Sequence, residues 1–161
     1  MLVKIYLFTT IASFVKAESG IVGFMLEAEH KGETITLYDF VRVSANKETS
    51  ELIAFVLALT HILRPCDIEL YSSTGLAYSR LQTGILHKWK DQNWLNSRKM
   101  PIKDAAFWKK LLELYEERVI SLDFTRTDRH SYTRWMTDYI EKNNEFIKEY
   151  GLSIKEGAND V

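Results

Sequence analysis

Hydrophobic and polar residues alternate near the start of the chain in a way that predicts strands. Three such stretches lie at about 2–10, 20–28 and 33–43. The second and third are separated only by His30, Lys31 and Gly32, a composition that favours a tight turn. In the first stretch, alternate positions are aliphatic, as in a half-buried strand: Val3, Ile5 and Leu7. We therefore expect an antiparallel meander of three strands.

A helix is expected next, at about 48–63. Its apolar residues recur at intervals of three and four, which gives it a face that packs on the sheet: Leu52, Phe55, Val56 and Leu59. Asn46 or Thr49 is suited to cap its start, and Pro65 is suited to stop it. Glu51 lies one residue off the apolar stripe, so we expect its carboxylate at the edge of the buried face.

The remaining chain predicts a strand, a helix, a strand and a helix. We expect these elements at about 67–73, 103–117, 119–126 and 132–150. The strand at 67–73 follows a helix, so it should run parallel to the first strand through a right-handed crossover. Gly151 suits the C-terminal cap of the last helix. We expect one domain at 1–150 and a flexible tail at 151–161, which is polar and rich in small residues.

The overall composition is that of an ordinary globular protein, but its charge is unevenly distributed. The 161 residues suit one domain, and the net charge of -1 gives no nucleic-acid signature for the whole chain. Residues 87–110, which we name the basic handle, hold seven basic and two acidic side chains, whereas the rest holds 14 basic and 20 acidic. This asymmetry concentrates positive potential on one segment. A solvated helix-loop-helix face is the alternative explanation of the same pattern.

The cysteine and histidine content and the N-terminal pattern exclude several classes of function. Cys66 is the single cysteine, so the chain has no internal disulfide or thiolate metal cluster, and we expect this residue buried at a helix-to-strand junction. The four histidines have no metal-ligand spacing. Lys4 and the apolar run 5–15 imitate a secretory signal, yet cleavage there would delete a strand. We therefore expect a structural role for this run, a cytoplasmic protein and no membrane span.

The basic handle carries a resemblance to a known family. The sequence HKWKDQNWLNSRKMPIKDAAFWKKL at 87–111 combines two tryptophans among lysines, a Met-Pro break and a helix restart. It resembles the handle of type 1 ribonuclease H, which grips the backbone of an RNA/DNA hybrid. The matching residues are Trp89, Trp94, Lys99, Pro101, Lys103 and Trp108. The likeness covers about residues 2–148 and implies an α/β fold with a five-stranded mixed sheet, order 3-2-1-4-5, flanked by helices.

The resemblance also implies where an active site would lie. The family cleaves with four carboxylates that hold two Mg²⁺ ions. Here Phe8 and Ser73 stand at two of those positions, whereas Glu51 and Asp138 match the other two. The first strand contains no acid, and Glu69 lies four residues before Ser73, roughly 13 Å away along an extended strand. We therefore expect no nuclease activity, no required cofactor, and only weak Mg²⁺ binding at Glu51 and Asp138.

Positions that read the substrate in the family also differ here. Residues 46–49 (Asn, Lys, Glu, Thr) replace an asparagine-rich approach to the catalytic helix. Gly75 replaces a glutamine-like residue, and Asp128 stands where the family has a flexible-loop histidine. A preference for hybrid over other duplexes is therefore not implied.

Three functions fit these observations. The first is a nuclease-dead module that binds RNA/DNA hybrid or another duplex through seven residues of the basic handle: Lys88, Trp89, Lys90, Trp94, Arg98, Lys99 and Lys103. The second is a protein-interaction scaffold, favoured by the mixture of Trp, Arg and Met in the basic handle. The third is a residual Mg²⁺-dependent hybrid ribonuclease using Glu51 and Asp138. The expected partner is duplex nucleic acid, with a protein as the alternative.

Overall fold

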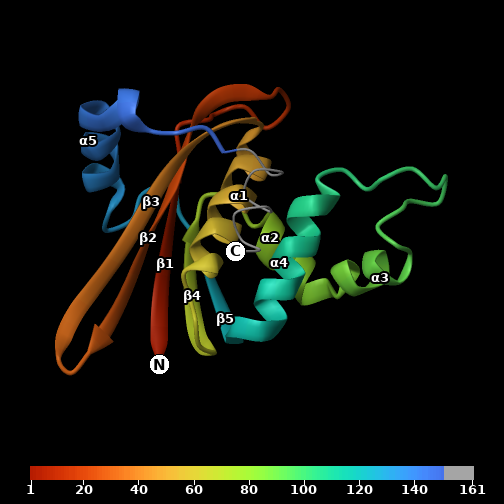
Figure 1. The fold of residues 1–161 in the computed structure, drawn as a ribbon, viewed down its shortest axis with the longest axis horizontal. Helices are drawn as coiled ribbons and strands as arrows, with labels where there is room; N and C mark the ends of the chain where they lie inside the picture. Colours follow the sequence, from red (N-terminus) through yellow and green to blue (C-terminus); the bar gives the residue numbers. More distant parts are fainter. Residues whose placement is uncertain (151–161) are drawn as a thin grey trace.

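A five-stranded mixed sheet forms the centre of the molecule. The computed structural model describes residues 1–150, and Figure 1 shows the sheet with helices on both sides. The strands are β1 (Leu2–Thr9), β2 (Glu18–His30), β3 (Glu33–Ala45), β4 (Cys66–Ser72) and β5 (Val119–Arg126). Their order is β3-β2-β1-β4-β5, with β1–β2 and β2–β3 antiparallel and β1–β4 and β4–β5 parallel. The predicted sheet order and the opening meander are confirmed.

The β2–β3 hairpin turns over two residues, as its sequence predicts. Lys31 and Gly32 both have positive φ, 52° and 81°, and the last strand pair is His30 with Glu33. Two consecutive positive φ values match the right-handed twist of the flanking strands. Gly23 in β2 leaves room for the Phe40 side chain, because a Cβ at this position would lie 2.3 Å from the Phe40 ring.

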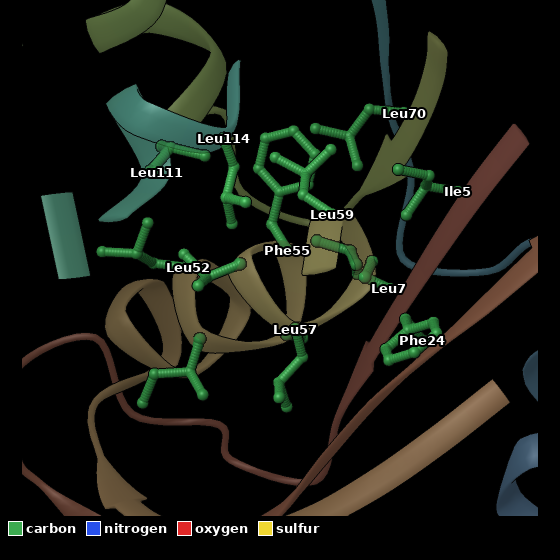
Figure 2. Close-up of a cluster of buried hydrophobic side chains, with 14 of the residues drawn as sticks. Ile5, Leu7, Phe24, Leu52, Phe55, Leu57, Leu59, Leu70, Leu111 and Leu114 are labelled. Carbon is green, nitrogen blue, oxygen red and sulfur yellow. The ribbon is translucent and has the colours of Figure 1, made fainter. Parts of the chain in front are cut away.

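Helix α1 (Lys47–Thr60) lies at the centre of the main core rather than on its edge. Asn46 caps it, since its Oδ1 accepts from the Thr49 backbone N at 2.9 Å. Every residue from Ser50 to Leu59 is buried, because the sheet covers one side and α4 (Ala105–Arg118) covers another. Figure 2 shows α1 side chains packed among residues of β1, β2, β4 and α4. The expectation of a single buried stripe is therefore wrong for this helix.

Three further helical elements complete the side of the sheet that α1 covers. Helices α2 (Leu76–Thr83) and α3 (Ile85–Asp91) are joined at Gly84, which has a φ of 74°. The chain then loops to α4, and Figure 1 shows α3 and this loop projecting from the body of the protein. Within residues 1–150, every helix is too short or too polar to cross a lipid bilayer.

The last helix is shorter than the sequence suggests. Helix α5 (Thr133–Asn143) gives way to a 3₁₀ turn at Asn144–Phe146, whereas we expected a helix over 132–150. Arg42 on β3 explains the early end, because its guanidinium donates to the Asn144 carbonyl and side chain at 3.0 and 2.8 Å. Its backbone then pairs with Lys148 and Tyr150, so the chain leaves the helix to run beside β3. The proposed cap at Gly151 and the tail at 151–161 lie outside the described residues.

The central strand β1 is buried on both faces, and not on one as expected. Val3, Ile5 and Leu7 belong to the main core under α1. Tyr6 is buried in a second, smaller core under α5, and Phe8 packs against it. Cys66, 2% exposed at the start of β4, occupies the buried junction that its sequence context predicts.

Candidate functional site

Glu51 is the buried acid at the centre of the candidate site. It lies in the second turn of α1 and is 3% exposed. Its Oε2 accepts from Ser72 Oγ at 3.0 Å and from the Ser73 backbone N at 3.1 Å, and its Oε1 accepts from Ser73 Oγ at 2.6 Å. We name these three residues the Glu51 cluster. Three of about four acceptor positions on the carboxylate are thus filled by the protein itself.

The serines reach Glu51 because β4 ends directly beside α1. Ser72 is the last residue of β4 and Ser73 follows it, at the end of a strand that runs parallel to β1. Ser72 Oγ is also within 3.1 Å of the Thr74 carbonyl, which fixes the turn that leads to α2. The serines are neutral donors, so they bind the carboxylate without providing a second negative ligand for a metal.

Thr9, and not Phe8, extends from β1 toward the start of α1. Thr9 Oγ1 is 2.8 Å from Ser50 Oγ, next to Glu51. Phe8 points to the opposite face of the sheet, where it packs on the core under α5. Phe8 stands at the position of a family carboxylate, yet its ring lies on the face of the sheet away from Glu51, because side chains alternate between faces along a strand. The position nearest to Glu51 carries a hydroxyl.

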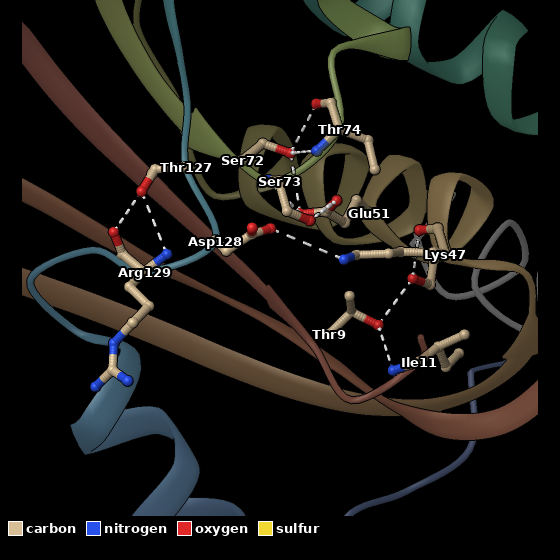
Figure 3. A network of polar contacts seen from close by, with 11 residues as sticks. Thr9, Ile11, Lys47, Glu51, Ser72, Ser73, Thr74, Thr127, Asp128 and Arg129 are labelled. Carbon is tan, nitrogen blue, oxygen red and sulfur yellow. Dashed lines mark hydrogen bonds and ion pairs between the residues drawn. The ribbon is translucent and has the colours of Figure 1, made fainter. Parts of the chain in front are cut away.

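Lys47 and Asp128 form an ion pair near the Glu51 cluster. Lys47 Nζ is 4.0 Å from Asp128 Oδ1, and the lysine side chain is only 21% exposed. Figure 3 shows this pair in the same network of polar side chains as Glu51, with Thr9 beside it. Asp128 follows β5, where we had expected it to stand for a loop histidine.

Neither Asp138, the expected partner of Glu51, nor Glu69, which its place on the strand had ruled out, belongs to the Glu51 cluster. Asp138 is exposed in the second turn of α5. Glu69 lies on the face of β4 away from α1, where its carboxylate accepts from the Tyr71 hydroxyl at 3.0 Å. Burial and this bond raise the pKa of Tyr71 to about 12. Within residues 1–150, no three His, Cys, Asp or Glu side chains form a group that could hold a metal ion. The donors present do not fit a two-Mg²⁺ centre.

His130 lies two residues after Asp128, the position of the family's loop histidine, and hydrogen bonds hold its ring in place. Its Nε2 lies 2.8 Å from the Leu7 carbonyl, and its Nδ1 accepts from the Tyr132 backbone N at 3.1 Å. This pattern requires a neutral ring that donates from Nε2. Burial lowers the pKa of His130, which favours the same state. The ring therefore anchors the loop after β5 to β1.

The tryptophans of the basic handle fasten it to the body of the protein. Trp89 and Trp94 are half-buried and pack against the main core. Trp89 meets the buried Trp108 edge to face, with ring centroids 6.3 Å apart. The Arg80 guanidinium lies over both rings, 5.1 Å from Trp89 and 4.6 Å from Trp108. These rings hold the basic handle in position, so only part of each can meet a ligand.

Asn96 organises the projecting loop of the basic handle. Its Oδ1 accepts from the backbone N of Arg98 at 2.9 Å and of Met100 at 3.0 Å. Its backbone also pairs with Met100 and Lys99. Six cations of the basic handle are exposed, and within residues 1–150 none forms an ion pair: Lys88, Lys90, Arg98, Lys99, Lys103 and Lys109.

Comparison with known proteins agrees with this architecture. A family model of RNase H matches residues 3–144. The chain belongs to the RNase H family. The ribonuclease H of Clostridium botulinum is 30% identical to this family member over 128 residues, which cover 80% of this chain and 82% of that protein.

Solved structures of RNase H proteins share the fold at low identity. LC9-RNase H1, a type 1 RNase H with the type 2 active-site motif, has a TM-score of 0.64 at 14% identity and covers 86% of this chain and 69% of its own. LC11-RNase H1 in complex with an RNA/DNA hybrid has a TM-score of 0.52 at 18% identity, covering 82% and 89%. These likenesses establish the fold of this RNase H family member.

Several residues of the site could not be identified from the sequence. Thr9, Ser50 and Ser72 are ordinary small polar residues, and no spacing marks them as neighbours of Glu51. Lys47 and Asp128 are 81 positions apart and meet only because the loop after β5, which His130 anchors to β1, reaches the start of α1. The one available signal was the alternation along β1, which places Leu7 and Thr9 on the same face.

Proposed function

We propose that this RNase H family member binds duplex nucleic acid through its basic handle and does not cleave it. The observation that carries the proposal is the state of Glu51, whose carboxylate is bound by Ser72 and Ser73 where a metal centre would require further acids. The basic handle, by contrast, presents unpaired cations to solvent. The chain thus combines a charged surface for a ligand with a site that lacks ligands for two metal ions.

Phosphate binding is the chemistry that the basic handle suits best. Lys88, Lys90, Arg98, Lys99 and Lys103 are all exposed. Lysine and arginine contacts to phosphate are independent of sequence and release counterions, so affinity should fall steeply with salt. The binding of an RNA/DNA hybrid by LC11-RNase H1, which shares the fold, supports a duplex as ligand. RNA/DNA hybrid and other duplexes are both included in the proposal.

The absence of cleavage follows from the donors available at the Glu51 cluster. In-line hydrolysis with two ions needs ligands that hold both metals near the attacking and leaving oxygens. Glu51 offers about one free acceptor position, and Asp138 is exposed on α5. We infer that Mg²⁺ binds weakly, with a dissociation constant on the order of millimolar, because the ion keeps most of its water. No cofactor is required for the proposed binding, and we keep a cytoplasmic setting as part of the proposal.

A cleavage assay tests the second half of the proposal. The purified protein should cleave an RNA/DNA hybrid no faster than a mock preparation with either Mg²⁺ or Mn²⁺. Cleavage that disappears in Glu51→Ala or Asp138→Asn would show that the site is active. A residual hybrid ribonuclease, the alternative enzyme function, would then replace our reading.

A binding assay with a matched control tests the first half. The triple variant Lys88→Ala, Lys99→Ala, Lys103→Ala should weaken binding to every duplex and reduce the salt slope by up to about three units. A control that removes three exposed lysines elsewhere has the same change in net charge: Lys16→Ala, Lys31→Ala and Lys142→Ala. Equal binding by the two triple variants would reject the basic handle as the binding surface.

A protein-interaction scaffold remains the second candidate, and an apolar groove favours it. The groove encloses about 300 Å³ beyond the C-terminal end of α1, between the β2–β3 hairpin and the loop that leads to β4. Four large apolar side chains along it are exposed: Met1, Ile35, Leu37 and Leu63. Failure of the wild-type protein to bind any duplex at low salt would favour this function.

A further inference from the structure

The ammonium group of Lys47 lies at the start of α1, one turn before Glu51. Lys47 is the first residue of α1, one helical turn before Glu51, so both side chains leave the helix on the same side. Its ammonium is 4.0 Å from Asp128 Oδ1. In Figure 3 the Lys47 side chain extends from α1 to Asp128, and a dashed line joins the two charged groups.

Lys47 is held in this position from two sides. Its backbone N donates to the Ser13 carbonyl at 2.7 Å, which ties the start of α1 to the loop between β1 and β2. Its ammonium also lies 5.4 Å from the centre of the Phe14 ring, a favourable cation–π distance. The side chain is 21% exposed, compared with 84% for Asp128, so the lysine is the more enclosed partner.

The charges around Lys47 explain what it does there. Glu51 is buried, and within residues 1–150 it forms no ion pair, although hydroxyl and backbone donors surround it. Asp128 brings a second carboxylate to the ammonium of Lys47, which lies one turn before Glu51 on α1. Two carboxylates near one another attract a cation, and a fixed ammonium repels any further cation that approaches.

We propose that Lys47 takes the place of a divalent cation between Glu51 and Asp128 and keeps such a cation out. The inference rests on the proposed function, because it explains how a site that does not cleave remains electrically balanced. Removal of the lysine charge should therefore create a divalent cation site where the wild-type protein has none of comparable strength. The ligands would be the carboxylates of Glu51 and Asp128, with Ser73 Oγ and water.

The test is Mn²⁺ binding to full-length variants, measured by calorimetry and by the electron paramagnetic resonance signal of the bound ion. Lys47→Met keeps the length of the side chain and removes its charge, and should strengthen Mn²⁺ binding roughly tenfold or more. Lys47→Arg keeps the charge and should bind Mn²⁺ as the wild-type protein does. Lys103→Met is the matched control, because it removes an exposed charge from the basic handle.

A second substitution in the Lys47→Met variant identifies the ligands of the new Mn²⁺ site. Adding Glu51→Gln or Asp128→Asn to Lys47→Met should abolish the gain, with circular dichroism showing that each variant is folded. If Lys47→Met fails to fold, Lys47→Gln takes its place. Mn²⁺ binding by the Lys47 variant no stronger than by Lys103→Met would overturn the inference, as would a gain that survives both second substitutions.

The outcome separates this inference from the proposed function. Tight Mn²⁺ binding or hybrid cleavage by the wild-type protein would contradict the proposed function. An inactive wild-type protein together with unchanged Mn²⁺ binding in Lys47→Met would leave the proposed function standing and remove only the role of Lys47.

Discussion

Replacing Glu51 should reveal that this acid is a structural residue. Glu51→Ala removes the acceptor of the Ser73 backbone N, of Ser73 Oγ and of Ser72 Oγ. A buried N–H without a partner costs about 1–3 kcal/mol, and the two hydroxyls lose about 1 kcal/mol together because Ser72 keeps its contact with Thr74. The lost methylene adds about 0.8 kcal/mol. We expect a loss of about 3–5 kcal/mol in the free energy of unfolding.

Glu51→Gln should behave differently for a geometric reason. A glutamine oxygen in place of Oε2 still accepts from Ser72 Oγ and the Ser73 backbone N, and its amide can donate to Ser73 Oγ. All three contacts survive and a buried charge disappears. The free energy of unfolding should therefore stay within about 1 kcal/mol of the wild-type value.

Urea unfolding followed by tryptophan fluorescence and circular dichroism measures both variants. The loss in Glu51→Ala corresponds to a fall in Tm of roughly 6–20 °C for a chain of this size. Glu113→Ala, on the exposed side of α4, is a matched control and should change little. An alanine variant as stable as the wild-type protein, or more stable, would refute the structural role, since removal of a carboxylate held under strain for catalysis often stabilises.

Three further predictions concern other parts of the molecule. Burial lowers the pKa of His130 from 6.5, so its contribution to the free energy of unfolding is complete above that pH and is lost as the pH falls toward the pKa of the folded protein. In His130→Gln this loss should be absent when the free energies of unfolding at about pH 7.5 and 5.5 are compared. Gly23→Ala places a Cβ 2.3 Å from the Phe40 ring and 2.8 Å from the Asp39 carbonyl, and should lower the free energy of unfolding by about 1–3 kcal/mol in urea titration. Tyr71→Phe should remove one ionisation near pH 12 from an absorbance titration. Each argument would be contradicted by a variant that equals the wild-type protein: His130→Gln in its pH dependence of unfolding, Gly23→Ala in its free energy of unfolding, and Tyr71→Phe in its absorbance titration.

Local signals in the sequence predicted much of the fold. The turn at Lys31 and Gly32, the Asn46 cap and the buried Cys66 all follow from a few neighbouring residues. The strand order follows from the resemblance to the family, and the family is confirmed. These features depend on backbone preference and on patterns that recur within a short stretch.

The rest depended on contacts between distant segments. The early end of α5 reflects Arg42, 102 positions before Asn144, and no helix signal near 144 announces it. The burial of α1 on several sides depends on α4, which the apolar stripe of α1 does not reveal. At the site, strand alternation would have assigned Phe8 to the face away from Glu51, but the meeting of Lys47 with Asp128 required the folded structure.

The central place of α1 determines which part of the molecule can open. The helix packs against β1, β2, β3, α2 and α4, so its amide protons can exchange with solvent only when the whole core unfolds. The loop of the basic handle has few such neighbours and can fluctuate without disturbing the core. The Glu51 carboxylate is therefore held by the part of the molecule that opens last, whereas a ligand of the basic handle meets a surface that can adjust to it.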